Sequence, residues 1–223
     1  MTTQHDWIDL EDARGYVAAP SGGGPGVLVL HAWWGLTPVF TRLCDRLAEA
    51  GFVALAPDLY QGRTANTIDE AKALLKQRDD EAAQAAASAA VETLRQHPAV
   101  KAPKGLGAIG FSMGAGWAAL LSAQRPADLA AVVLFYGASD ADFTKARAAY
   151  QGHFAVPDDW EPKEYVDAME QAMRSAGREV SLHFYPGAGH WFFEDNRPDA
   201  YQPEAAALAW TRTLEFLRSH LEG

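Results

Sequence analysis

The sequence contains very little cysteine. Its 223 residues include a single one, Cys44, so no disulfide can form within the chain, and the class of small disulfide-stapled proteins is excluded. A chain of this length buries about 70% of its unfolded surface and can fold without such support. One unpaired cysteine is compatible with a reducing compartment, so we expect a cytoplasmic protein.

Long hydrophobic runs and an excess of basic residues are also missing. No apolar run approaches the roughly 18 residues that a membrane span requires, and Met1 to Asp6 lack the basic region of a signal peptide. The chain has 19 Lys and Arg against 29 Asp and Glu, a net charge of −10. Nucleic-acid binders need clustered basic side chains, and no His, Cys and acid cluster has zinc-ligand spacing. We therefore expect no membrane, nucleic-acid, metal or cofactor partner.

Strand-like and helix-like segments alternate along the chain. Apolar runs at 27–31, 52–56, 106–111, 131–136, 150–155 and 180–185 predict strands, and the periodicity predicts helices at 37–51, 67–96, 113–124, 162–176 and from 201 onward. Repeated strand–helix units predict an α/β fold with a mostly parallel sheet covered by helices on both faces. Residues 7–18 predict a hairpin at one edge, and no linker or repeat divides the chain. We expect one domain spanning 1–223.

Two helices carry apolar stripes that predict their inward faces. Cys44 lies on such a stripe with Phe40 and Leu47, so we interpret it as a small core side chain rather than a reactive thiol. In the last helix, the predicted inward residues are Trp210, Leu214, Leu217 and Leu221.

A serine lies in a glycine pattern between a predicted strand and a predicted helix. Gly110-Phe-Ser112-Met-Gly114 matches the Gly-x-Ser-x-Gly nucleophile elbow, a tight turn that raises the serine above the sheet. Glycine is needed on either side because side chains there would collide with the backbone. Ser112 is therefore the candidate nucleophile, and the start of the following helix offers unpaired N–H groups to developing negative charge.

The serine needs a base and an acid, which in this topology follow it in the order Ser, acid, His. His190 is the best base because it ends a glycine-rich loop after the last predicted strand, with His31 and His153 as alternatives. The acid must lie between Ser112 and His190. Asp158 is our choice and Asp159 the reserve, and Asp140 and Asp142 are less favoured because they follow an earlier strand.

The loop after residues 27–31 is expected to supply a second oxyanion donor. The backbone N–H of Trp33 would join that of Met113, a main-chain role that side-chain identity does not test. Aromatic residues surround these loops and fit either the core or a hydrophobic acyl or alcohol pocket. They are Trp33, Trp34, Trp160, Trp191, Phe192 and Phe193.

Four segments together resemble the dienelactone hydrolase family of α/β-hydrolases. They are Val27–Leu36, Ala56–Tyr60, Gly110–Gly114 and Phe184–His190, in the family's order and over most of the chain. The resemblance implies an α/β-hydrolase fold with a minimal lid or none. It also implies a catalytic triad of Ser112, Asp158 and His190, with oxyanion donors from Trp33 and Met113.

The chain departs from the family's best-known enzymes at three positions. Those enzymes carry a cysteine nucleophile where this chain has Ser112, and a glutamate where it has Ala32; a serine needs no partner to control thiol ionisation. They also use an arginine shortly after the histidine to bind a carboxylate, where this chain has Glu194. A charged Glu194 in the pocket would repel an anionic substrate. The tentative pocket residues are Ala32, Trp34, Trp160, Trp191, Phe192 and Glu194.

These observations predict a serine hydrolase that cleaves a small-molecule carboxylic ester, lactone or thioester without a cofactor. An acyltransferase or peptidase with the same triad is one alternative. A binding protein that keeps the fold without turnover is another, because a fold alone does not fix a function. A monomer and a homodimer both remain open.

Overall fold

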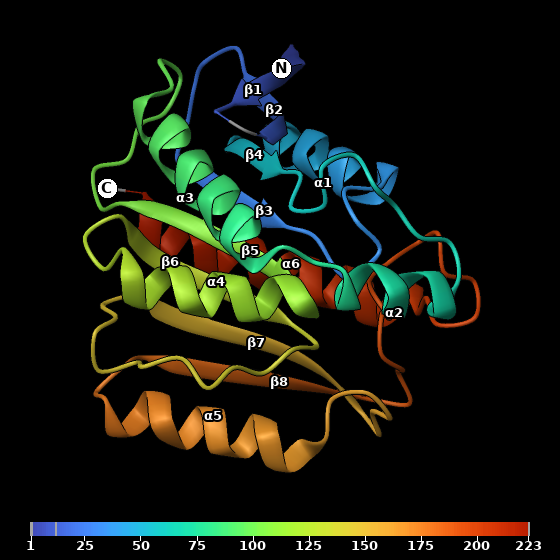
Figure 1. Ribbon diagram of the computed structural model, residues 1–223. Coiled ribbons are helices and arrows are strands. Elements are labelled where there is room, and N and C mark those ends of the chain that lie inside the picture. The colour runs from blue at the N-terminus through green and yellow to red at the C-terminus, as the bar shows by residue number, and fades with distance from the viewer. Residues whose placement is uncertain (1, 12, 223) are drawn as a thin grey trace.

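The computed structural model describes residues 2–11 and 13–222, whose eight strands form one sheet (Figure 1). The spatial order is β1-β2-β4-β3-β5-β6-β7-β8. The strands are β1 (Thr3–Leu10), β2 (Ala13–Pro20), β3 (Gly26–Leu30), β4 (Val53–Pro57), β5 (Leu106–Phe111), β6 (Leu129–Phe135), β7 (Ala149–Val156) and β8 (Val180–Pro186). The helices are α1 (Pro38–Glu49), α2 (Ile68–Lys76), α3 (Asp80–Gln96), α4 (Met113–Gln124), α5 (Lys163–Ser175) and α6 (Pro203–Leu221).

The sheet is mostly parallel, which confirms the predicted α/β architecture. Strands β3 to β8 run parallel to one another, whereas β1 and β2 form an antiparallel hairpin whose second strand pairs antiparallel with β4. Because parallel strands end at a common edge, the loops after β3, β5, β6, β7 and β8 lie at the same side of the sheet.

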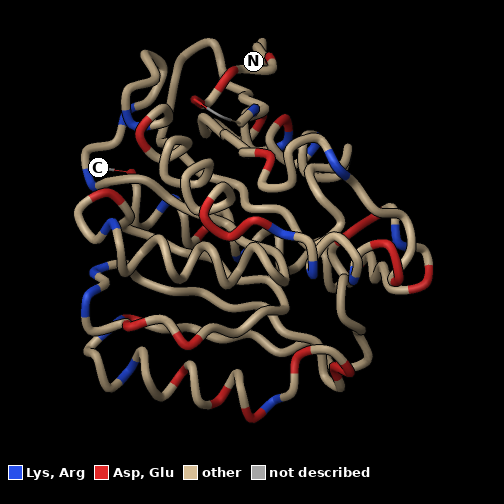
Figure 2. The backbone as a smooth tube through the Cα atoms, viewed as in Figure 1, with Lys and Arg blue, Asp and Glu red and all other residues tan. Residues whose placement is uncertain are grey.

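Helices cover both faces of this sheet (Figure 1). Helices α1 and α6 pack against one face, and α3, α4 and α5 pack against the other. Strands β3 to β8 contain no Asp, Glu, Lys or Arg, and Figure 2 shows the charged residues on the surrounding helices and loops. Apolar runs without alternation are typical of strands that are buried on both faces.

The predicted helix over 67–96 is wrong in one respect, since it is two helices. Thr67 caps α2 by a capping box with Glu70, as its spacing indicates. The chain then leaves the helix after Lys76, and Asp79 caps α3 by accepting a hydrogen bond from the N–H of Ala82 at 3.0 Å. The N-cap at Asp79 therefore interrupts a segment whose composition alone predicts one continuous helix.

The inward face of α6 is also rotated from the predicted one. Leu217 and Leu221 are fully buried as expected, but Trp210 and Leu214 are only half-buried. The deeper positions belong to smaller residues, including Ala209. Trp210 instead lies under the Arg46 guanidinium, 4.4 Å from its ring centroid, and this cation–π contact suits a large ring at the rim of the core.

Cys44 is fully buried within α1, in accordance with its predicted place on the apolar stripe. Burial strongly raises the pKa of its thiol, because the thiolate would lose its hydration there. A thiol in this setting packs as a small hydrophobic group.

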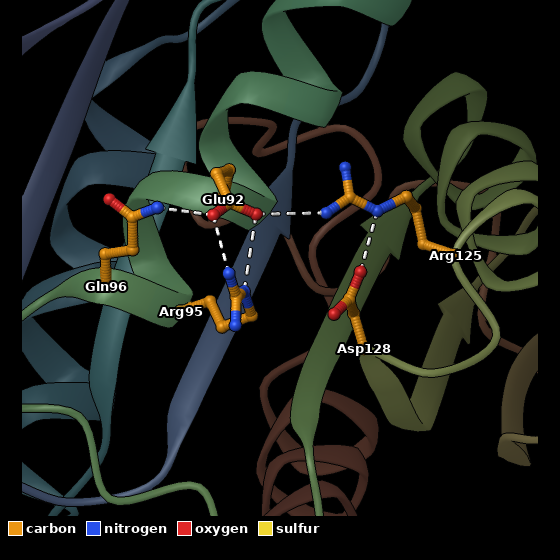
Figure 3. A network of polar contacts seen from close by, with 5 residues as sticks. All are labelled: Glu92, Arg95, Gln96, Arg125 and Asp128. Atoms are coloured by element: carbon orange, nitrogen blue, oxygen red, sulfur yellow. Dashed lines mark hydrogen bonds and ion pairs between the residues drawn. The ribbon is translucent and has the colours of Figure 1, made fainter.

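A polar network joins α3 to the turn between α4 and β6, at the amino-terminal edge of the sheet (Figure 3). Arg125 donates to Glu92 at 3.2 Å and to Asp128 at 2.7 Å. Glu92 also accepts from Arg95 at 2.7 Å and from Gln96. These groups are partly exposed, so each pair contributes little alone, but together they link the C-terminal turn of α3 to the turn after α4.

Among the described residues, no helix is long and apolar enough to cross a membrane.

Candidate active site

Ser112 lies in the sharp turn between β5 and α4. Its backbone has φ 49° and ψ −114°, a strained conformation for a residue with a side chain. The N–H of Ser112 donates to Phe135 of β6 at 2.9 Å, and its carbonyl accepts from Ala115 of α4 at 2.9 Å. Neighbouring backbone therefore holds the turn that the glycine pattern predicts.

The two glycines of the pattern are needed for close backbone approach. A Cβ at Gly110 would lie 2.2 Å from the carbonyl oxygen of Gly114. A Cβ at Gly114 would lie 2.1 Å from the carbonyl oxygen of Leu30, at the end of β3. Both distances are far below van der Waals contact, so only glycine fits at either position.

The structure brings Ser112, His190 and Asp158 together in one chain of hydrogen bonds. His190 Nε2 lies 3.2 Å from Ser112 Oγ, and His190 Nδ1 lies 2.8 Å from Asp158 Oδ2. The side chains of His190 and Asp158 are 5% and 4% exposed, so water screens their interaction weakly. Since a carboxylate only accepts, Nδ1 carries the proton, and Nε2 is free to accept one from the serine.

The loop after β7 orients the acid. Asp158 Oδ1 accepts from the backbone N–H groups of Trp160 at 2.9 Å and Glu161 at 3.0 Å, which leaves Oδ2 facing His190. The reserve candidate Asp159 is exposed. Asp140 is exposed as well, and Asp142 is engaged with Lys145 at the surface.

The alternative bases His31 and His153 lie in the core. His31 accepts from the N–H of Leu59 at 3.1 Å, and its other ring nitrogen lies 2.7 Å from the carbonyl oxygen of Ala32. His153 contacts the hydroxyl groups of Tyr185 and Thr213 at 2.8 and 3.1 Å. Burial lowers the pKa of both imidazoles, which indicates neutral structural histidines.

The two expected oxyanion donors lie on neighbouring elements. Met113 is the first residue of α4, where helix N–H groups lack intrahelical acceptors. The contact between Gly114 and Leu30 sets the start of α4 against the end of β3. The loop that carries Trp33 begins there, and Gly35 donates to the carbonyl of Ala32 to close its turn.

Four tryptophans gather around the loops that carry Asp158 and His190. Trp33 lies with its ring centroid 5.3 Å from that of Trp160 and 5.9 Å from that of Trp191, and Trp34 lies 5.2 Å from Trp191. Only Trp160 is substantially exposed, at 41%. The cluster adjoins His190, whose ring centroid lies 4.9 Å from that of Trp191, and Trp160 lies at its outer rim.

Two of the tentative pocket residues lie in the core. Ala32 and Phe192 are fully buried, and Phe192 packs on Tyr185 at 4.9 Å. Phe193 is likewise in the core, against Phe135. For Phe192 and Phe193, the positive φ of 65° at Trp191 turns the chain inward directly after His190.

Glu194 is also fully buried, which corrects the argument that it repels an anionic substrate. Its Oε1 accepts a hydrogen bond from the Tyr136 hydroxyl at 2.9 Å. Burial raises the pKa of the Glu194 carboxyl to about 8, with Arg197 acting in the opposite direction. At neutral pH the carboxyl is therefore mostly uncharged, and the expected repulsion does not arise.

Sequence reasoning missed Tyr136 and Gly137, which follow β6 at the catalytic edge. Tyr136 has a positive φ of 39°, and its ring lies 5.0 Å from that of His190. A Cβ at Gly137 would lie 2.4 Å from the carbonyl oxygen of Ser112. The available signal was their position directly after a buried parallel strand, where site residues gather in α/β folds.

A cavity of about 560 Å³ opens between the loop after β6 and helix α5. It adjoins the site through Ala138, which follows Gly137, and through Glu161, whose carboxylate accepts from the N–H of Ala138 at 2.8 Å. Its lining residues are Ala138, Ser139, Asp140, Ala141, Glu161, Tyr165, Ala168, Met169 and Ala172. The only charged side chains among them are acidic.

Within residues 2–11 and 13–222, no group of three or more His, Cys, Asp and Glu side chains is arranged to hold a metal ion.

The fold is that of an α/β-hydrolase, with Ser112 in the sharp turn between β5 and α4. The model of the dienelactone hydrolase family matches residues 13–221. The chain therefore belongs to the dienelactone hydrolase family.

Individual relatives cover nearly the whole chain. A protein of Aquifex aeolicus named "Putative carboxymethylenebutenolidase" is 32% identical, over 94% of each chain. A Bradyrhizobium protein named "Probable 2-oxo-3-(5-oxofuran-2-ylidene)propanoate lactonase" is 34% identical, over 100% of this chain and 97% of its own. The crystal structure titled "Putative Dienelactone Hydrolase" from Klebsiella pneumoniae superposes with a TM-score of 0.87 at 25% identity, covering 99% of this chain and 100% of its own.

The close approach at Gly114 predicts a sharp difference between two glycines of α4. Gly114→Ala places a methyl group on the Leu30 carbonyl and should lower the free energy of unfolding by more than about 2 kcal/mol. Gly116→Ala is the matched control, because a Cβ there meets nothing within 4 Å. It should raise stability by up to about 1 kcal/mol through helix propensity. Urea denaturation measures both; equal effects would contradict the elbow geometry.

The raised pKa of Glu194 predicts a pH-dependent stability difference between wild type and Glu194→Gln. The carboxyl has an ordinary pKa of 4.5 in the unfolded chain and about 8 in the folded one. Its contribution to stability is therefore complete below about pH 4 and is lost as the pH rises toward 8. Between pH 5 and 8 wild type should lose about 1 kcal/mol per pH unit relative to the variant. A difference that stays constant over that range, measured by denaturant unfolding, would contradict burial of this carboxyl.

Proposed function

We propose that this protein is a serine hydrolase that cleaves a carboxylic ester bond. Lactones are the first candidate substrates, and thioesters are a further class open to the same chemistry. The observation that carries the proposal is the hydrogen-bonded chain from Ser112 Oγ through His190 to Asp158, with the serine on a strained elbow. The names of the two curated relatives, a carboxymethylenebutenolidase and a lactonase, support the choice of lactones.

The reaction proceeds through an acyl-enzyme. Ser112 Oγ attacks the carbonyl carbon while its proton passes to His190 Nε2, and Asp158 stabilises the imidazolium through Nδ1. The backbone N–H groups of Met113 and Trp33 stabilise the negative charge on the carbonyl oxygen. His190 then protonates the leaving alcohol, whose C–O bond breaks.

Water completes the cycle at the same groups. His190 takes a proton from water as the water oxygen attacks the acyl carbon, and it returns that proton to Ser112 Oγ as the acid leaves. Every proton is accounted for by these side chains, so the proposal invokes no cofactor or metal. We place the protein in the cytoplasm as a monomer or homodimer acting on a small molecule.

Replacing the nucleophile tests the proposal directly. Ser112→Ala should reduce hydrolysis of p-nitrophenyl acetate by about 10³-fold or more, because the triad acts as a unit. Ser122→Ala is the matched control, since Ser122 is a buried serine of helix α4 that bonds Tyr150 and takes no part in the proposed reaction. Equal turnover by wild type and Ser112→Ala would overturn the assignment.

Two further measurements separate the alternatives. A fluorophosphonate should add covalently to Ser112, detected by peptide mass, whereas a binding protein without an assembled triad should not react. Product analysis with competing amine and alcohol acceptors should yield free acid; dominant transfer to the acceptor would favour an acyltransferase.

The cavity beside the site predicts a preference among leaving groups. We expect it to hold the leaving alcohol of neutral or cationic esters, because its charged lining residues, Asp140 and Glu161, are both acidic. Choline esters should exceed esters of a hydroxycarboxylate alcohol of matched size, whose leaving group is anionic, in kcat/KM by about tenfold. Ala172→Trp should lower kcat/KM for long leaving groups but not for p-nitrophenyl acetate. An unchanged chain-length profile in that variant would place the leaving group elsewhere.

A further inference from the structure

A buried carboxyl lies near the catalytic histidine without a part in the proposed reaction. Glu194 is fully buried, and among the described residues the single hydrogen bond of its carboxyl comes from the Tyr136 hydroxyl at 2.9 Å. The second carboxyl oxygen, Oε2, is buried without a partner. Burying a carboxyl with half of its bonding capacity unused costs free energy, so such a group needs an explanation beyond packing.

The partner of this carboxyl touches the catalytic histidine. The Tyr136 ring lies 5.0 Å from the His190 ring at an interplanar angle of 56°. Tyr136 therefore meets His190 with its ring and Glu194 with its hydroxyl. Asp158 holds one ring nitrogen of His190, but a hydrogen bond at one atom leaves the imidazole free to tilt about it. A ring packed against the imidazole restricts that tilt.

The backbone around Tyr136 is strained where it meets the site. Tyr136 adopts a positive φ of 39°, and the next residue, Gly137, is in close contact with the carbonyl of Ser112. The backbone N–H of Tyr136 donates to the carbonyl of His153 at 2.8 Å, which ties Tyr136 to β7. Strained non-glycine residues persist where the surrounding structure holds them and cluster at functional sites.

Glu194 reaches Tyr136 from the loop that carries His190. Within that loop the N–H of Phe192 donates to Gly189 at 3.2 Å and the N–H of Glu194 donates to Trp191 at 2.9 Å. The two consecutive turns set His190 and Glu194 in one compact unit. The hydrogen bond from Tyr136 to Glu194 therefore crosslinks the histidine loop to the end of β6, 58 residues earlier in the chain.

We propose that Glu194 is a positioning residue, which holds the Tyr136 ring against His190 and thereby fixes the imidazole for proton transfer with Ser112. The inference rests on the proposed hydrolase function, because it assigns a role within that reaction. Glu194 touches neither the substrate nor the reacting atoms, so it acts on the chemical step through Tyr136 and His190.

The test compares three variants in the full-length protein, with kcat and KM measured on p-nitrophenyl acetate. Glu194→Leu and Tyr136→Phe should each lower kcat about tenfold with KM within about twofold, because misplacement of the base affects the chemical step more than binding. Glu194→Gln should recover most of that loss, since its amide oxygen still accepts from Tyr136. Tyr136→Phe removes one oxygen atom only, so it keeps the test valid if Glu194→Leu does not fold.

A control separates positioning from stability. Thr213→Val removes another buried hydrogen bond, the one to His153 at 3.1 Å, and it should lower the Tm while leaving kcat within about twofold of wild type. Unchanged kcat in Glu194→Leu and Tyr136→Phe would overturn the proposal. Equal losses in Glu194→Gln and Glu194→Leu would do the same, because the hydrogen bond would then be irrelevant.

The outcomes also separate this inference from the proposed function. Absence of hydrolysis by wild type, or equal hydrolysis by Ser112→Ala, would overturn the function and the inference together. An active wild type that loses activity in Ser112→Ala but not in Glu194→Leu or Tyr136→Phe would overturn the positioning role alone.

Discussion

The contact between the first turn of α4 and the end of β3 is the constraint on which the site depends. Strand β3 pairs with β5 so that Leu30 lies opposite Gly110, and the Leu30 carbonyl then leaves no room for a side chain at Gly114. This approach sets the loop of Trp33 beside Ser112. On the other side Ser112 bonds β6 through Phe135 and contacts Gly137. The serine is thus clamped between its two neighbouring strands.

The two edges of the sheet are stabilised by different means. At the carboxyl edge, Ser112, Tyr136 and Trp191 all have positive φ, and fully buried polar groups are tied to one another. At the amino edge, Glu92 and Arg125 form a solvated network that involves no strained backbone. Strain and buried polarity therefore accompany the proposed chemistry, whereas ordinary surface ion pairs hold the opposite side together.

Much of the site could be predicted from the sequence, because a backbone that leaves no room for a side chain requires glycine, and glycine is visible in the sequence. Glycines at 110 and 114 mark the elbow, and the position of each loop after a parallel strand indicates His190 and Asp158. The break at Asp79 was missed because a polar capping residue within an Ala- and Glu-rich segment is hard to distinguish from a helical one. The residues of both helices were nevertheless predicted to be helical.

The surroundings of His190 could not be predicted in the same way. The directions of Phe192 and Glu194 depend on the positive φ of Trp191, for which a tryptophan gives no local signal. The hydrogen bond between Glu194 and Tyr136 joins residues 58 positions apart, and a local sequence pattern cannot predict a contact over that separation. The residue type of Glu194 suggested a charged side chain in the pocket, whereas its burial in the core favours the uncharged carboxyl.

The burial of Cys44 has a practical consequence for chemistry at the elbow. The chain's only native thiol is inaccessible and its pKa is raised, so it offers almost no thiolate to an alkylating or disulfide reagent in the folded state. A cysteine introduced at position 112 would be the single addressable sulfur of the native protein. Probes, crosslinkers or spin labels could then be attached at position 112 without first replacing Cys44.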